Sequence, residues 1–362
     1  MADRKILLKI LLAVFLLSAT QSANAKVTSD DGEEGFNPGT FILDHIGDAY
    51  DWHILSYGKN PNKHHVSVPL PVILYSKELG FNLFLSSKFH HGHEPYNGFK
   101  IATEGAYKGK IVYANRPGER PMLDISITKN VFALLVSIAI ILWVFISVAN
   151  TYVRRGNHAP KGLQSWVEPV ILFVRDDIAR PALGHRYKRF MPYLLTLFFF
   201  ILINNLMGLI PFFPFGANVT GNIAITLVLA VMTFIITTCS TNKGYWAHIF
   251  NAPGVPIWLK IPVPLMPLVE LMGVFIKPFV LMIRLFANIT AGHIIVIGFF
   301  SLIFLFSDVF NSSAMGYGVS VLSVAFTVFM GFLELLVSFI QAYVFTLLSA
   351  LYFGMAKPQE HH

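Results

Sequence analysis

The chain has 362 residues, of which 54% are hydrophobic and only 13% are charged. Soluble domains carry about 25% charged residues, so this composition indicates a membrane protein whose apolar surface faces lipid. The formal net charge is +7, but the basic residues cluster in loops between apolar stretches, which excludes a nucleic-acid surface as its cause. The single cysteine, Cys239, excludes an intrachain disulfide and a multi-cysteine metal site.

Residues 1–25 have the features of a secretory signal peptide. A positively charged start precedes the apolar stretch 10–19, which is too short to span a membrane, and Ala23-Asn24-Ala25 fits a small-x-small cleavage site. The alternative is an uncleaved first anchor. With either, the segment that follows is expected outside the cytoplasm.

Residues 26–125 are more polar and are predicted to form a small, partly β extracytoplasmic domain. Glycine, proline and histidine separate its short strand-like runs, which cover 65–68, 71–75, 81–85 and 110–113. A cluster of histidines here could bind a metal ion, but such clusters are more often solvated surface, so no metal site is predicted. The side chains concerned are His64, His65, His90, His91, His93 and Glu94.

Residues 126–357 are predicted to form the membrane domain, which begins with an uncharged span over 131–149. The segment 153–190 follows and is rich in basic residues, so the positive-inside rule makes it cytoplasmic. These residues are Arg154, Arg155, Lys161, Arg175, Arg180, Arg186, Lys188 and Arg189. Inside this segment, one apolar helical face predicts a helix that lies on the membrane surface or, as we favour, packs against a partner. That face consists of Leu163, Trp166, Val167, Val170, Ile171, Val174 and Ile178.

The second and third spans are predicted over 191–212 and 222–240, joined by the uncharged outer loop 213–221. Lys243 and Lys260 then mark an inner loop. Five prolines break regular structure after the third span and indicate a connection. They are Pro253, Pro256, Pro262, Pro264 and Pro267.

Two long apolar stretches, 268–306 and 317–355, close the membrane domain and are separated by the polar turn 307–313. A continuous helix of either length would measure about twice the hydrocarbon thickness of a bilayer. Each stretch could split into two spans, but neither has a turn signal near its centre. We therefore predict two long, tilted helices in one hairpin, followed by a cytoplasmic tail over 358–362. The expected fold is an all-α polytopic membrane protein with about five membrane helices.

Polar side chains occupy matching positions along the two arms of this hairpin. In an antiparallel pair, residues at one height have a nearly constant sum of residue numbers, and three polar pairs share such a sum. The pairs are Arg284 with Gln341, Asn288 with Ser338, and His293 with Glu334. Arg284 and His293 are half a helical revolution apart, so a bend or a site on the flank between the arms is needed.

The chemistry of these residues predicts two access routes separated by a fixed charge. His293 and Glu334 titrate, or can be tuned to titrate, near neutral pH and can pass protons. Glu270 lies on nearly the same face as Arg284, toward the cytoplasm, and could hydrate an inner route. Arg284 keeps its charge at all relevant pH values, blocks direct passage of cations and favours the ionised form of a nearby carboxylate. The alternative is a polar seam that only holds two helices together.

The residues from about 130 to 357 resemble subunit a of the F-type ATP synthase. The resemblance rests on Asn205-Leu206-Met207-Gly208-Leu209-Ile210-Pro211, Glu270 with Lys277-Pro278, the run from Arg284 to His293, and Gln341-Ala342-Tyr343-Val344-Phe345. It implies that Arg284 faces a rotating ring of c subunits and displaces a proton from each ring carboxylate. It further implies an outer half-channel lined by Asn288, His293, Glu334, Ser338 and Gln341, and an inner one at Glu270.

Two departures from the family pattern concern the outer route. Well-known bacterial members have an acid at the position of His293 and a histidine at that of Glu334, so the order of proton transfer here is open. Some members carry an acid at Gly208, a position to which we assign no proton-transfer role. The leader and the amino-terminal domain extend beyond the common core of the family.

The resemblance implies a non-catalytic subunit that conducts protons for ATP synthesis, and the sequence contains no phosphate-binding Gly-x-x-x-x-Gly-Lys-[Ser/Thr] motif. No cofactor or nucleic acid is expected. The expected partners are the c-subunit ring, the b subunits of the peripheral stalk, other synthase subunits and lipid. The predicted location is the bacterial inner membrane, with the amino terminus in the periplasm and the carboxyl terminus in the cytoplasm. The rival functions are a stand-alone transporter, for which the sequence lacks an internal repeat, and a membrane-anchored sensor, which would leave Arg284 without a purpose.

Overall fold

The computed structural model describes residues 46–57, 64–92, 94–155, 161–210, 214–242, 265–310 and 313–356, with a few isolated positions outside these ranges. The predicted signal peptide, most of the proline-rich connection, Lys243, Lys260 and the tail 358–362 lie outside the described residues.

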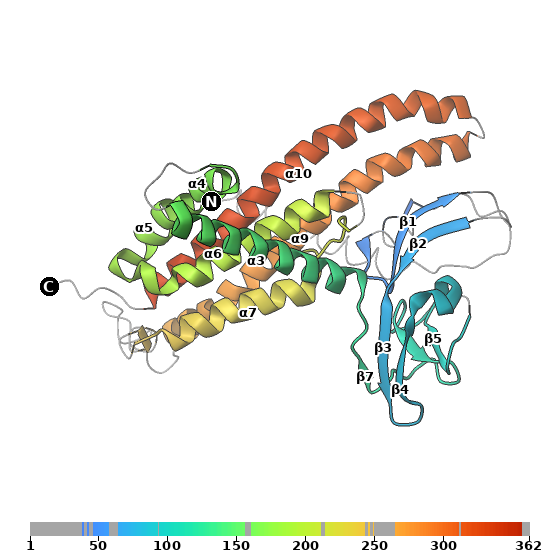
Figure 1. Ribbon diagram of the computed structural model, residues 1–362, viewed down its shortest axis with the longest axis horizontal. Helices are drawn as coiled ribbons and strands as arrows, with labels where there is room; N and C mark the ends of the chain where they lie inside the picture. Colours follow the sequence, from blue (N-terminus) through green and yellow to red (C-terminus); the bar gives the residue numbers. More distant parts are fainter. Residues whose placement is uncertain are drawn as a thin grey trace.

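Five apolar helices make up most of the described structure. α3 (Lys129–Arg155), α6 (Tyr187–Leu209) and α7 (Ile223–Cys239) run alongside one another (Figure 1). α9 (Leu265–Val309) and α10 (Ser313–Met355) complete the set. Four described helical stretches are long and apolar enough to cross a bilayer, and α7, with 17 residues, is a shorter fifth. The prediction of an all-α polytopic membrane protein is confirmed.

The last two helices form the predicted hairpin, and each arm is one continuous helix of 45 or 43 residues. Both run obliquely to α3 and α7 (Figure 1). The polar turn is shorter than predicted, because Ser307 and Val309 still belong to α9 and the amide of Phe310 donates to the carbonyl of Phe306. Serine and aspartate are only mildly unfavourable in a helix, and this stretch contains no glycine or proline to end it.

The amphipathic segment after α3 is helical but not uniform. It consists of α4 (Leu163–Phe173), a π-helical stretch η2 (Val174–Ala179), α5 (Arg180–Leu183) and the short η3 (Gly184–Arg186). Val167, Val174 and Ile178 are buried in the common helical core, as packing against another element requires. The side chain of Trp166 on the same predicted face is 83% exposed, whereas Gln164 is buried.

The domain before α3 is partly β, as predicted, and the four predicted runs fall on four of its strands. These are β2 (His64–Pro69), β3 (Pro71–Ser76), β4 (Gly80–Leu85) and β6 (Ile111–Tyr113). The sequence analysis missed the 3₁₀ helix η1 (Ser86–Gly92) and the strands β1 (Asp51–Tyr57), β5 (Phe99–Ile101) and β7 (Leu123–Asp124). The last two strands have three and two residues, too few to show a period of two.

Two small sheets and one three-stranded sheet build this domain. β1 pairs with β2, β5 pairs with β6, and the third sheet has the order β4-β3-β7, all antiparallel. The domain core is formed by Tyr50, Val72, Leu74, Phe89, Phe99 and Ile111.

The β domain is tied directly to the helices at the start of α3. Trp52 packs with Ala133 and with Ala217 and Val219 of the loop between α6 and α7. The amide of Lys129 donates to the carbonyl of Ala49 at 2.9 Å. The sheet region and the outer ends of the helices therefore share one packed junction.

Candidate functional site

The structure brings His293 of α9 and Glu334 of α10 into contact. Nδ1 of His293 lies 2.9 Å from Oε1 of Glu334, and the side chains are 15% and 5% exposed. The distance is that of an ion pair, although Oε1 has no aligned hydrogen-bond partner among the described residues. Phe299 stacks on Phe326 farther along the hairpin, with ring centroids 5.2 Å apart. The matching of heights predicted for His293 and Glu334 is confirmed.

Gly292 explains how Glu334 can lie so close to the backbone of α9. A Cβ atom at Gly292 would lie 3.0 Å from Oε1 and 3.1 Å from Cδ of Glu334. Any larger residue would therefore press on the carboxyl group. The sequence analysis missed this role, because a lone glycine within an apolar helix gives no signal of what faces it.

His293 lies on the flank of the hairpin, where α6 ends. A Cβ atom at Gly208 would lie 3.4 Å from Nε2 of His293, so Gly208 forms the wall beside the second ring nitrogen. The imidazole of His293 therefore lies on the flank of the hairpin and not on the face that carries Arg284, as the half revolution between the two residues requires. A carboxylate at position 208, as in some members of the resembled family, would lie beside His293.

Asn205 of α6 links the same region to α10 and to the loop before α7. Its Nδ2 donates to the backbone carbonyl of Ser338 at 3.3 Å, and its Oδ1 accepts from the hydroxyl of Thr220 at 2.6 Å. Asn205, Thr220 and Ser338 are all buried. From the sequence, Asn205 was identified only as part of a motif. Thr220 was missed, because the sequence of a loop does not show which of its threonines is buried against a polar side chain.

Several buried polar atoms of this region have no hydrogen-bond partner within the described part of the protein. They are Glu334 Oε1, Ser338 Oγ, Asn204 Oδ1, Asn218 Nδ2, Thr290 Oγ1 and Thr327 Oγ1. Buried polar groups nearly always have partners, and ordered water supplies those that protein does not. The polar atoms around His293 and Glu334 can therefore hold water between the helices.

Arg284 is half-buried at the edge of the packed face of α9. Its neighbours Leu281 and Leu285 are buried in the helical core, whereas Ile283 is 41% exposed. Among the residues that the structure describes, no acidic side chain forms an ion pair with Arg284. The charge that complements this arginine is thus absent from the described part of the chain.

The other two predicted pairs are less close than His293 and Glu334. Gln341 and Ser338 are buried on α10, whereas Asn288 is exposed on α9. Neither Arg284 with Gln341 nor Asn288 with Ser338 forms a hydrogen bond between these described side chains. Arg284 and Asn288 are four residues apart, so both lie on the side of α9 that the protein leaves open.

A second polar region lies between α7, α9 and α10, on the other side of Arg284 from His293. A cavity of about 20 Å³ is lined by four threonines on α7 and just after it, by Val274 and Lys277 of α9, and by Tyr245 and Tyr352. Glu270 precedes Val274 and Lys277 by one and two helical turns. Burial raises the pKa of Tyr245, and the negative charge of nearby Glu270 raises it further. The threonines are Thr233, Thr237, Thr238 and Thr241.

The described histidines of the β domain form no converging metal site. Nε2 of His90 lies 3.6 Å from Oε2 of Glu94, and both side chains are 66% exposed. Within the described ranges, no three histidine, cysteine or acidic side chains come together. His93 and the side chains of His64, His65 and His91 lie outside the described part of the protein.

Comparisons with known proteins assign the two regions separately. Residues 131–354 match the family model described as ATP synthase A chain, and residues 41–131 match a domain of unknown function, DUF8433. The chain is similar to ATP synthase subunit a of Chloroherpeton thalassium, with 44% identity over 66% of this chain and 69% of that relative. It is also similar to ATP synthase subunit a 2 of Chlorobaculum tepidum, with 45% identity over 64% of each chain. A third relative, ATP synthase subunit a 2 of Prosthecochloris aestuarii, is 43% identical over 66% of this chain and 71% of its own length.

The family model covers more than half of the chain, and it covers the helices that carry Arg284, His293 and Glu334. The helical architecture and these comparisons lead to one conclusion: the chain belongs to the ATP synthase A chain family, the subunit a of F-type ATP synthases.

Proposed function

We propose that the chain conducts protons through two offset half-channels, with Arg284 between them, at an interface with a rotating ring of c subunits. Membership of the family makes it a multi-pass protein of the bacterial inner membrane with a role in Fo proton translocation. The two routes, the ring and the residue roles go beyond that membership and are the content of the proposal.

The single observation that carries the proposal is the open position of Arg284. A guanidinium on a membrane helix costs about 3 kcal/mol or more unless it is paired or hydrated, and no described carboxylate pairs with it. An acidic group on a partner would supply the missing charge. A carboxylate that passes Arg284 on a rotating ring would lose its proton there, because the nearby positive charge stabilises the ionised form.

The outer route would run past His293 and Glu334. At 2.9 Å, a proton could pass directly between the imidazole of His293 and the carboxyl group of Glu334. Buried polar atoms beside them, including Ser338 Oγ and Thr290 Oγ1, would hold the water that continues the path. Asn288 and Gln341 would line the end of this route near Arg284.

The inner route would begin at Glu270 and lead to the threonine-lined cavity beside Lys277. The cavity volume of about 20 Å³ is enough for a water molecule. Thr233, Thr237 and Thr241 donate their hydroxyl hydrogens to backbone carbonyls, so their oxygens remain as acceptors that an apolar helix face would lack. Arg284 lies between this cavity and His293 along α9. A proton that arrives by one route would therefore have to bind a ring carboxylate, move with the ring and leave by the other route.

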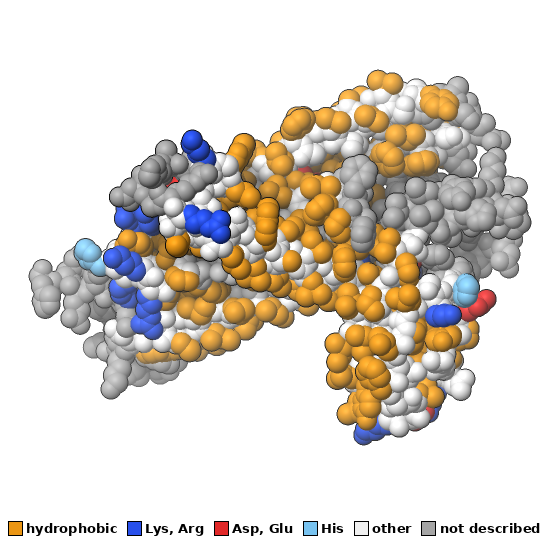
Figure 2. Space-filling view, in the orientation of Figure 1, with side chains coloured by type: hydrophobic (Ala, Val, Ile, Leu, Met, Phe, Trp, Pro, Cys, Tyr) orange, Lys and Arg blue, Asp and Glu red, His pale blue; other side chains and the backbone are white. Residues whose placement is uncertain are grey.

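The orientation follows from the distribution of charge. Figure 2 shows lysine and arginine side chains gathered at the end of the helices opposite the β domain. By the positive-inside rule, that end would be cytoplasmic, and the β domain and the amino terminus periplasmic. Contacts with the b subunits of the peripheral stalk, and the absence of a catalytic site from this chain, belong to the same proposal.

The test uses inside-out membrane vesicles that carry the complete synthase. Arg284→Ala should abolish ATP-driven proton pumping, measured with a pH-sensitive dye, whereas Ile283→Ala, at an exposed apolar neighbour, should keep it. Mild purification of the full chain should also recover a ring of small hairpin subunits. Normal coupled pumping by the Arg284→Ala variant, or purification without such a ring, would contradict the proposal.

A further inference from the structure

The sheet β4-β3-β7 of the β domain is apolar on both faces. One face carries Val72 and Leu74 into the domain core. Burial alternates along β3 and from Phe81 to Leu85 of β4. Most of the residues that point the other way are exposed, whereas Ile73 is half-buried. We call these residues the outer sheet face: Tyr75, Phe81, Leu83, Leu85, Leu123 and Ile125.

The outer sheet face is contiguous across its strands. Phe81 of β4 is paired with Tyr75 of β3, which in turn is paired with Leu123 of β7, so the three side chains form one row. Phe81 is 66% exposed and Leu83 is 63% exposed. Soluble proteins rarely leave so many neighbouring apolar side chains open, and such patches mark contact with another protein or a membrane.

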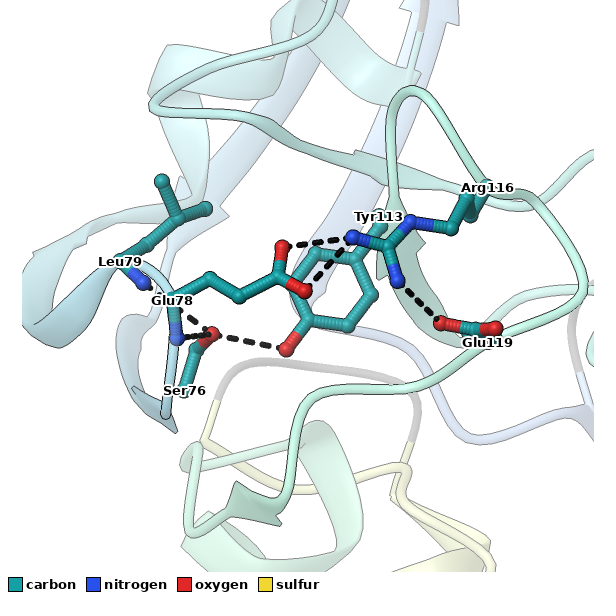
Figure 3. A network of polar contacts seen from close by, with 6 residues as sticks. All are labelled: Ser76, Glu78, Leu79, Tyr113, Arg116 and Glu119. Carbon is teal, nitrogen blue, oxygen red and sulfur yellow. Dashed lines mark hydrogen bonds and ion pairs between the residues drawn. The ribbon is translucent and has the colours of Figure 1, made fainter.

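Polar contacts hold this sheet rigidly at the tip of its hairpin (Figure 3). Nη2 of Arg116 donates to both carboxylate oxygens of Glu78 at 2.6 and 2.7 Å, and Nη1 donates to Glu119 at 2.9 Å. The hydroxyl groups of Ser76 and Tyr113 lie 2.7 Å apart, and the oxygen of Ser76 accepts from the amides of the β3–β4 turn. These contacts join the β3–β4 turn to Tyr113 and Arg116, which lie on β6 and after it.

The outer sheet face continues into the lipid-facing surface of α3. After β7, the amides of Ile125 and Ile127 still bond to carbonyls of β3, and α3 begins at Lys129. Ile125 is 60% exposed, and Leu135 on α3 is 50% exposed. Figure 2 shows that apolar side chains cover the side of the β domain that is turned back along the helices. A bilayer around the helices would meet the sheet at this corner.

We propose that the outer sheet face lies on the membrane that the helices span, with its side chains in the boundary between headgroups and acyl chains. Its occupant is phospholipid, because the patch is continuous with a surface that lipid already covers. Aromatic side chains such as Tyr75 and Phe81 suit this boundary, where one end is apolar and the other is wet. The β domain thereby braces the outer ends of the helices against the bilayer. This inference needs the membrane position of the helices and does not rest on the proton route.

The test places fluorescent labels on the full chain in proteoliposomes. In a Cys239→Ser background, single cysteines are introduced as Phe81→Cys, Leu83→Cys and Ile125→Cys, all at exposed positions. Lys88→Cys on η1, which packs on the other side of the domain core, is the matched control. A nitroxide on the lipid, about 5–10 Å below the headgroups, reports insertion, and a water-soluble quencher reports exposure to solvent.

The expected result is loss of fluorescence by the lipid quencher at positions 81, 83 and 125, with protection from the aqueous quencher, and the reverse at position 88. Equal access of the aqueous quencher to all four positions would overturn the inference. Protection from both quenchers at positions 81 and 83 would also overturn it, because a protein, such as a second copy of this chain, would then cover the face. Two positions on β4 and one just after β7 keep the result independent of damage by any one substitution.

Discussion

The α9–α10 hairpin and the β domain distribute polar and apolar side chains in opposite ways. The hairpin hides polar groups such as Glu334 and Gln341 and turns apolar side chains outward. The β domain has an apolar core, and it also leaves Phe81 and Leu83 exposed on the outer face of its three-stranded sheet. In the hairpin the surroundings are lipid, so our proposal assigns the function to the buried polar groups. In the domain, the exposed apolar groups need the explanation.

The largest effect is expected from substitutions of the buried pair in the hairpin, His293 and Glu334. His293→Ala or Glu334→Ala should each lower ATP-driven pumping at least about tenfold, because each variant removes one of the two groups that would carry the proton, and about 1.4 kcal/mol of added barrier gives that factor. The double exchange His293→Glu with Glu334→His should retain more activity than either single loss. Pumping rates in vesicles provide the measurement, and equal losses in the single and exchanged variants would show that the two side chains do not act as a pair.

A smaller change tests the close approach of the two arms. Gly292→Ala places a Cβ atom 3.0 Å from Oε1 of Glu334, so the carboxyl group must move away, and pumping should fall by less than in the variants that remove the side chain. Gly331→Ala is the matched control, since a Cβ atom there would meet nothing within 4 Å.

Both substitutions improve helix propensity by up to about 1 kcal/mol, so a general effect of alanine would appear in the two variants alike. Reduced pumping in Gly331→Ala of the same size as in Gly292→Ala would refute the role of Gly292.

The smallest expected effect concerns a polar contact in the β domain, where it should affect stability and not transport. The hydroxyl of Tyr50 donates to Oδ2 of Asp124 at 2.6 Å, and burial and this carboxylate raise the pKa of Tyr50 above its usual value. Tyr50→Phe should cost about 1–2 kcal/mol of local stability, measured by hydrogen exchange of the domain within the full chain.

The pH dependence of this contact has a defined sign. Because the pKa of Tyr50 is raised in the folded state, its contribution is complete below pH 10, the ordinary pKa of tyrosine, and is lost as the pH rises above that value. The Tyr50→Phe variant should lack this loss at high pH. A variant that loses stability above pH 10 as steeply as the wild type would show that another group is responsible.

The contrast between the two regions also explains what the sequence could predict. A charge in an apolar stretch is conspicuous, so Arg284, His293, Glu334 and the register of the hairpin could all be predicted from spacing. The roles of Gly208 and Gly292 could not be predicted, because each leaves space for a side chain of another helix, His293 and Glu334 respectively. In the β domain, the two apolar faces of Pro71–Ser76 appear in the sequence as one continuous apolar run. That run predicts a strand but gives no sign that one of its faces is open.

The central claim is that Arg284 separates two routes that would otherwise join. The most direct test is passive proton flux through vesicles from which the ATP-hydrolysing sector has been removed. Arg284→Ala should leak protons faster than the wild type, and a second substitution, Glu334→Leu, should suppress the leak because it closes the outer route. Flux equal to that of the wild type in Arg284→Ala, with ATP-driven pumping intact before the sector is removed, would contradict the claim.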